Sequence, residues 1–198
     1  MSAKRNLRKL FTAGFALIPA GAVADTQRAT VSVVAELPVA QAWEYLQDFS
    51  LPHNYVPGIT RTEIVSRRTS GVGAHRRVYD TSGDYLEETI IDWRDGQGFT
   101  IRLHDGERPM APFQRAEFSY LLSPAAPDAS LIELSITFEM PWGGFGETLG
   151  EWFILPVMEK RLVQIAAGMK HFYETGMAAT DADRDRLAAA VEVAPAAE

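Results

Sequence analysis

The sequence contains no cysteine, which excludes a disulfide framework, a thiolate nucleophile and any metal site built from cysteine. Its four histidines are scattered, and none has the H-x-x-x-H or H-E-x-x-H spacing of a metal site, so we expect no metal. No serine lies in a G-x-S-x-G turn, and neither G-x-G-x-x-G nor a P-loop is present. These absences argue against a hydrolase triad and a nucleotide cofactor, and no other cofactor is predicted.

Positive charge is also scarce outside the first 24 residues. The whole chain has 19 basic and 26 acidic residues, a net charge of −7. Residues 1–24 hold four of the basic residues and none of the acidic ones, which leaves a net charge of −11 on the remainder. Because nucleic acids and anionic membranes repel such a chain, we expect no nucleic-acid partner. A protein partner, if there is one, should be basic.

The first 24 residues have the three-part layout of a secretory signal peptide. A basic start at residues 4–9 precedes a short apolar run at 10–19 and an A-x-A site at 22–24. The run is too short to predict a membrane-spanning helix, and no stable membrane insertion is expected once the leader is removed. We therefore predict cleavage after Ala24 and a periplasmic or secreted protein. The alternatives are an uncleaved anchor, or a cytoplasmic protein whose leader is not a signal.

Between residues 30 and 140 the apolar residues mostly alternate with the period of β-strands. A strand at 30–36, a helix at 39–49 and a proline-bounded short helix or turn at 48–58 come first. Six strands follow, at residues 60–66, 72–80, 85–93, 99–103, 113–122 and 131–140. The short, regular turns between them predict consecutive antiparallel hairpins.

The last strong pattern is an amphipathic helix over residues 145–176. Its apolar stripe recurs at spacings of three and four, at Leu155, Met158, Leu162, Ile165, Met169 and Phe172. Pro156 should kink this helix or mark a restart. No other element is long enough to cover the sheet, so the gap between helix and sheet is where a small ligand would bind. The composition of residues 177–198, which are rich in alanine and acidic residues, predicts a flexible tail with helical potential near 181–191.

This order of elements resembles the START-like superfamily with the helix-grip fold, also described as polyketide cyclase/dehydrase and lipid-transport proteins. The similarity spans about residues 29–176 and is carried by VSVVAELPVAQAWEYLQDFSLPHNYVPG, GVGAHRRVYDTSGDYLEETIIDW, LIELSITFEMPWG and LPVMEKRLVQIAAGMKHFYETG. It implies an α+β domain over residues 25–176, with a six- to seven-stranded antiparallel sheet wrapped around the long C-terminal helix. It also implies a cavity for a hydrophobic molecule under that helix.

Candidate ligand-binding residues come from this helix, from the strands facing it and from loops that would frame an opening. Leu86 and Leu134 stand where some family members carry charged pocket residues, which implies a drier cavity suited to an acyl chain, an isoprenoid or a flat aromatic. Arg76 and Glu88 point inward if their strands alternate regularly, as a structural ion pair or as a ligand anchor. The full set is Trp43, Tyr55, Arg76, Leu86, Glu88, Phe99, Phe113, Leu134, Trp152, Leu155, Met158 and Leu162.

The resemblance leaves three functions open. The first is binding or carrying a hydrophobic small molecule. The second is a cyclase/dehydratase-type enzyme, whose visible acid–base candidates are Arg76, Glu88, Arg115, His53 and Tyr120. The leucines at two expected polar positions weigh against it, so no catalytic residue is assigned. The third is an accessory protein whose acidic surface steers it onto a periplasmic enzyme. The loop at 107–112 is either a gate, as in the family, or an ordinary connector.

Overall fold

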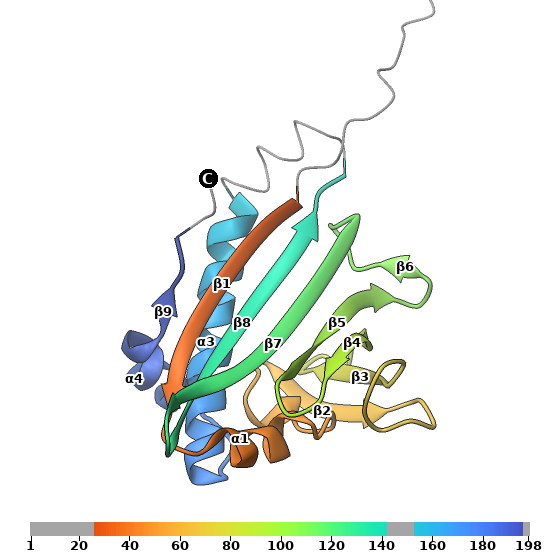
Figure 1. Ribbon diagram of the computed structural model, residues 1–198. Coiled ribbons are helices and arrows are strands. Elements are labelled where there is room, and N and C mark those ends of the chain that lie inside the picture. Colours follow the sequence, from red (N-terminus) through yellow and green to blue (C-terminus); the bar gives the residue numbers. More distant parts are fainter. Residues whose placement is uncertain (1–25, 142–152, 196–198) are drawn as a thin grey trace, which may run out of the picture.

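The fold is described by a computed structural model for residues 26–141 and 153–195 (Figure 1). The predicted signal peptide and the candidate residue Trp152 lie outside these residues. Within them, nine strands form one antiparallel sheet in the order β2-β3-β4-β5-β7-β8-β1-β9, with β6 paired only to β5. The α+β class with an antiparallel sheet around a long helix is confirmed.

The seven long strands of the sheet are those that the alternating pattern predicted, with their ends shifted by a few residues. They are β1 (Thr26–Ala35), β2 (Ile59–Ile64), β3 (His75–Asp80), β4 (Tyr85–Arg94), β5 (Gly98–Asp105), β7 (Arg115–Ala126) and β8 (Ala129–Glu139). The other two strands, β6 (Arg108–Pro109) and β9 (Glu192–Val193), have two residues each. A strand this short has no alternation, so the sequence pattern could not reveal it.

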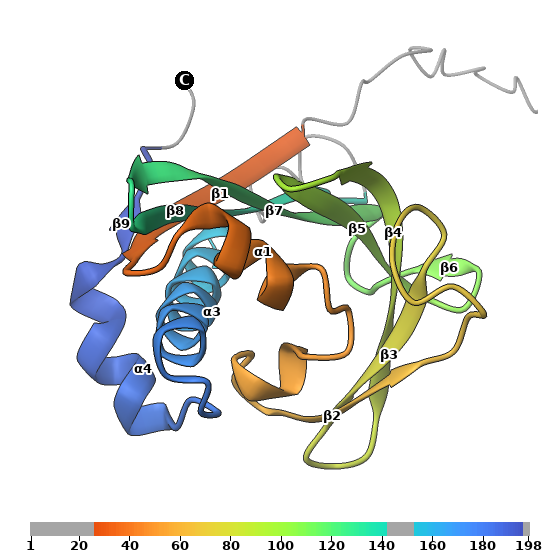
Figure 2. The same ribbon diagram turned by 60° about the horizontal axis from the view of Figure 1, so that its bottom comes forward.

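The long helix α3 (Leu155–Thr175) lies on the concave side of the curved sheet (Figure 2). Its buried face confirms the predicted stripe and includes Leu162, Ile165, Met169 and Phe172. Pro156 lies in the first turn of α3, where a missing N–H removes no helical hydrogen bond. Residues 145–152 of the predicted helix lie outside the described residues.

Two short helices cross one end of the concave side, α1 (Val39–Leu46) and the 3-10 helix η1 (Pro52–Asn54) (Figure 2). The chain after η1 approaches α3 closely at Gly168. A β-carbon added at Gly168 would lie 2.3 Å from the carbonyl oxygen of Tyr55. Only glycine allows this backbone contact. None of the described helices is both long and apolar enough to cross a membrane.

Residues 177–195 carry defined structure where a flexible tail was expected. Helix α4 (Asp181–Leu187) lies within residues 181–191, where helical potential was predicted. It packs against α3 and continues into the 3-10 helix η3 (Ala188–Ala190). A capping box begins α4: the Asp183 N–H donates to the Thr180 hydroxyl, and the Asp183 carboxylate accepts from the Thr180 N–H. Strand β9 then pairs with Val31 and Ser32 of β1. The sequence TDAD at 180–183 could have predicted this helix start.

Candidate functional site

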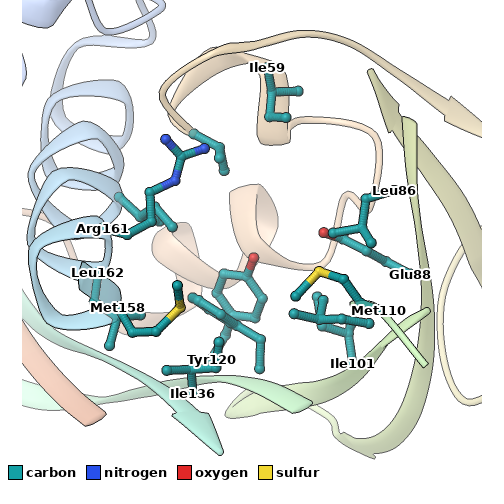
Figure 3. A pocket seen from close by; sticks show the side chains of 14 residues that line it. Ile59, Leu86, Glu88, Ile101, Met110, Tyr120, Ile136, Met158, Arg161 and Leu162 are labelled. Atoms are coloured by element: carbon teal, nitrogen blue, oxygen red, sulfur yellow. The ribbon is translucent and has the colours of Figure 1, made fainter. Parts of the chain in front are cut away.

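A cavity of ≈ 210 Å³ lies between α3 and the curled half of the sheet (Figure 3). Its floor is buried and consists of Glu88, Ile101, Leu103, Phe118, Tyr120, Ile136, Leu162 and Ile165. Its rim, which we call the mouth, is half-buried or exposed and consists of Val56, Ile59, Leu86, Met110, Met158 and Arg161. Eleven of these 14 lining residues are aliphatic, methionine or phenylalanine, so the cavity favours apolar ligands.

The most enclosed polar group beside the cavity is the ion pair of Arg76 and Glu88. These residues face each other across β3 and β4, and Arg76 Nε and Nη2 each lie 2.5 Å from Glu88 Oε2. Arg76 also donates from Nη1 to the carbonyl oxygen of Phe49 at 2.8 Å and lies over the Phe49 ring. Burial would lower the pKa of Arg76, but the charge of Glu88 raises it overall. Arg76 therefore stays charged, and its partner Glu88 lines the cavity.

The hydroxyl of Tyr120 points into the middle of the cavity, between Met158 on one side and Met110 and Glu88 on the other (Figure 3). Burial raises the pKa of Tyr120 well above its usual value, and it raises the pKa of Tyr55 to about 12. Both phenols therefore remain protonated at neutral pH. Tyr120 can donate a hydrogen bond to a ligand oxygen, but it is a weak proton donor for acid catalysis.

Four of the predicted site residues line the cavity: Leu86, Glu88, Met158 and Leu162. Arg76 lies behind Glu88, and only 1% of its side chain is exposed. Strand alternation was enough to orient the ion pair, and helical spacing was enough to place the two α3 residues.

The other described candidates lie in the surrounding core. Trp43 packs edge-on against Trp93, which stacks on Phe99, and Phe99 contacts Tyr120 at a ring distance of 5.0 Å. These rings support the wall of the cavity from behind. The remaining candidates do not line it either: Tyr55 packs on Phe172 and Tyr173, Phe113 on Phe138, Leu155 on the core, and Leu134 is fully buried.

Ten lining residues were not in the predicted set of ligand-binding residues, although Tyr120 had been named as an acid–base candidate. They are Val56, Ile59, Ile101, Leu103, Met110, Phe118, Tyr120, Ile136, Arg161 and Ile165. Arg161 could have been found, because it lies three residues after Met158 on the helix and so shares its side. The strand residues Ile101, Phe118 and Ile136 have the right alternation, but alternation does not tell how far along a strand the helix reaches.

A polar cluster on the opposite face of the sheet holds the turn that leads to Met110. The buried carboxylate of Glu87 accepts from Arg77 Nε at 3.0 Å and from the Gly106 N–H at 2.8 Å. His104 contacts the Gly106 carbonyl oxygen through Nδ1 at 2.7 Å. His75 Nε2 lies 3.8 Å from Glu87 Oε1, and 28% of its side chain is exposed. The cluster thus fixes one side of the mouth from outside.

This cluster predicts a pH dependence of stability. Burial lowers the pKa of His75 below its ordinary value; Glu87 opposes this shift, while His104, Arg77 and Arg102 add to it. The unfolded chain, with an imidazole pKa of about 6.5, therefore takes up the proton first as the pH falls. We expect the free energy of unfolding to decrease below that pH, and His75→Gln to remove part of the decrease.

Urea denaturation of both proteins between neutral and mildly acidic pH measures this difference. His53→Gln, which replaces an exposed histidine in η1 by the same residue, is the matched control. Identical profiles for wild type and His75→Gln would contradict the prediction.

Comparisons with known proteins agree with this architecture. A sequence model of the family described as polyketide cyclase / dehydrase and lipid transport matches residues 26–170. No curated protein sequence matches significantly. Among the described residues, no group of three or more His, Cys, Asp or Glu residues is arranged so that it could hold a metal ion.

Several solved structures share the fold. The Zhui aromatase/cyclase from a Streptomyces species has a TM-score of 0.59 and 16% identity, over 76% of this chain and 94% of that one. XoxI from Bacillus cereus has a TM-score of 0.57 and 15% identity, over 74% and 95%. Ara h 8.0201 has a TM-score of 0.55 and 18% identity, over 75% and 98%. At such identities the likeness shows the fold and not the activity.

Proposed function

The chain belongs to the polyketide cyclase/dehydrase and lipid-transport family, and on that premise we propose that it binds a hydrophobic small molecule in the cavity under α3. The observation that carries the proposal is the lining, in which 11 of 14 residues are apolar. Burying a ligand there gains roughly 25 cal/mol for each Å² of apolar surface.

The size of the cavity limits the ligand. At ≈ 210 Å³ it is smaller than the roughly 300–1,000 Å³ of typical ligand pockets. One flat ring system or a short acyl segment fills it. The mouth lets a longer ligand extend beyond the rim, so an acyl chain or an isoprenoid would be held by one end.

Filling the mouth should weaken binding. Met158→Trp places an indole in the rim, and we expect the affinity for the neutral dye N-phenyl-1-naphthylamine to fall at least about tenfold, equivalent to about 1.4 kcal/mol. Fluorescence titration measures this directly. Val157→Trp is the matched control, because Val157 is the neighbouring residue, is 58% exposed and does not line the cavity. Equal affinities in the two variants would contradict the proposal.

A second candidate is acid–base catalysis of the cyclase/dehydratase type, favoured by the presence of Glu88 and Tyr120 in one cavity. Tyr120 would hold a carbonyl oxygen, and Glu88 would accept a proton. The Glu88 carboxylate already accepts from two nitrogens of Arg76, which is why binding is the first proposal. Turnover of a polyketone substrate that Glu88→Gln abolishes, with the fold and the dye affinity unchanged, would favour catalysis.

We also propose that residues 1–24 direct export. N-terminal sequencing of the protein from a periplasmic or culture fraction should begin at Asp25. A mature protein that still begins with the leader would contradict cleavage.

A further inference from the structure

The two charged residues that line the cavity have very different surroundings. Glu88 is bound by Arg76 and neutralised within the fold. Arg161 lies on α3 at the mouth, and its side chain is exposed. One side of the cavity entrance therefore carries a guanidinium, whereas the rest of the rim is apolar.

The Arg161 guanidinium has unused hydrogen-bonding capacity. Nη2 donates to the carbonyl oxygen of Pro57 at 2.6 Å, which holds the side chain across the rim. No acidic residue in the described part of the chain forms a salt bridge with it. Partial burial, and then the positive charge of Arg184, lower the pKa of Arg161, although a guanidinium remains charged at neutral pH. Its environment thus opposes positive charge instead of neutralising it.

We propose that Arg161 binds the anionic head of an amphiphilic ligand whose apolar tail occupies the cavity. The inference rests on the proposed function and narrows the ligand class to amphiphiles with a carboxylate or phosphate head. The planar guanidinium matches the paired oxygens of either group. Figure 3 shows the arrangement: the guanidinium of Arg161 and the side chain of Ile59 lie on one side of the cavity, and Ile101, Tyr120 and Ile136 lie on the other.

The arrangement also fits the charge of the whole chain. A net charge of −7, or −11 without the leader, repels anions from most of the surface. Among the described residues, Arg161 at the entrance of the apolar cavity is a cation without a salt bridge and therefore a local exception. It would orient a ligand with its head outward and its tail inward.

Three ligands with the same eight-carbon chain test the inference: octanoate, octyl phosphate and octanol. Isothermal titration at low ionic strength should give at least one anion an affinity about tenfold higher than that of octanol, because only the anions form a charged hydrogen bond with Arg161. The expected gain is no larger because such a bond at an exposed site retains only part of its strength. Comparing the two anions identifies which head group is preferred. Arg161→Gln should remove the preference, so that the anions bind no more tightly than octanol.

The matched control is Lys160→Gln, which removes the same charge from the neighbouring, exposed residue of α3 that does not line the cavity. It should keep the preference for the anion. Octanol binding as tightly as both anions, or an unchanged preference in Arg161→Gln, would overturn the inference while the binding function stands. Loss of dye binding and of all three ligands in the folded wild type would contradict the proposed function, and the inference with it.

Discussion

Replacing Arg76 by methionine is expected to destabilise the protein by about 3–5 kcal/mol, because the substitution leaves the Glu88 carboxylate buried without its cation. Arg76 has only 1% of its side chain exposed, and its donors also hold the Phe49 carbonyl oxygen. The free energy of unfolding from urea denaturation at neutral pH measures the loss. The loss should shrink at acid pH, because an unpaired buried Glu88 takes up a proton more readily than it does in the unfolded chain.

Two further variants separate the buried charge from the loss of packing. The double variant Arg76→Met/Glu88→Leu removes both charges and should recover much of the stability, since apolar pairs often replace buried ion pairs at little cost. Arg94→Met, in an exposed pair with Asp92, should cost no more than about 1 kcal/mol. A single Arg76→Met variant as stable as Arg94→Met would show that the buried pair contributes nothing.

Gly168→Ala is expected to destabilise the protein by about 1–3 kcal/mol, the cost of forcing extra atoms into a packed site. In an ordinary helix interior the same change stabilises by roughly 0.5–1 kcal/mol, so even the sign is informative. The new β-carbon would lie 2.3 Å from the Tyr55 carbonyl oxygen. A main-chain atom cannot rotate away, so α3 or the segment after η1 must shift.

Thermal unfolding of Gly168→Ala and of Lys160→Ala, on the exposed side of the same helix, measures this effect. Lys160→Ala should change the free energy of unfolding by no more than about 0.5 kcal/mol. If α3 moves away from residues 55–59, the mouth widens and the neutral dye should dissociate faster. A stabilising Gly168→Ala would mean that the close approach does not exist in solution.

The sequence was sufficient for features that depend on local periodicity. Alternation along β3 and β4 oriented Arg76 and Glu88 inward, and the spacing of Met158 and Leu162 on α3 placed them at the cavity. The fold class followed from the order of these elements.

Features that depend on distances between helices and strands could not be predicted from the sequence. Phe99 and Trp43 are aromatic residues of the kind that often line ligand sites. They nevertheless pack on Trp93 and Tyr120, behind the wall of the cavity. Tyr120 differs from them in how far along the sheet it lies, which no pattern encodes. Met110 reaches the mouth because contacts of Glu87 and His104 with Gly106 hold the preceding turn. Glu87 and Gly106 are 19 positions apart in the chain, so no local pattern reveals their contact.

The pairing of β1 with β8 has a consequence for how the chain folds. Thr26 lies opposite Glu139, so the first strand has no partner until the last long strand has been synthesised. Closing so long a loop is entropically costly and slows folding. A chain emerging from the ribosome therefore stays incompletely folded until nearly all of the sheet is available, and the domain closes around α3 only after that.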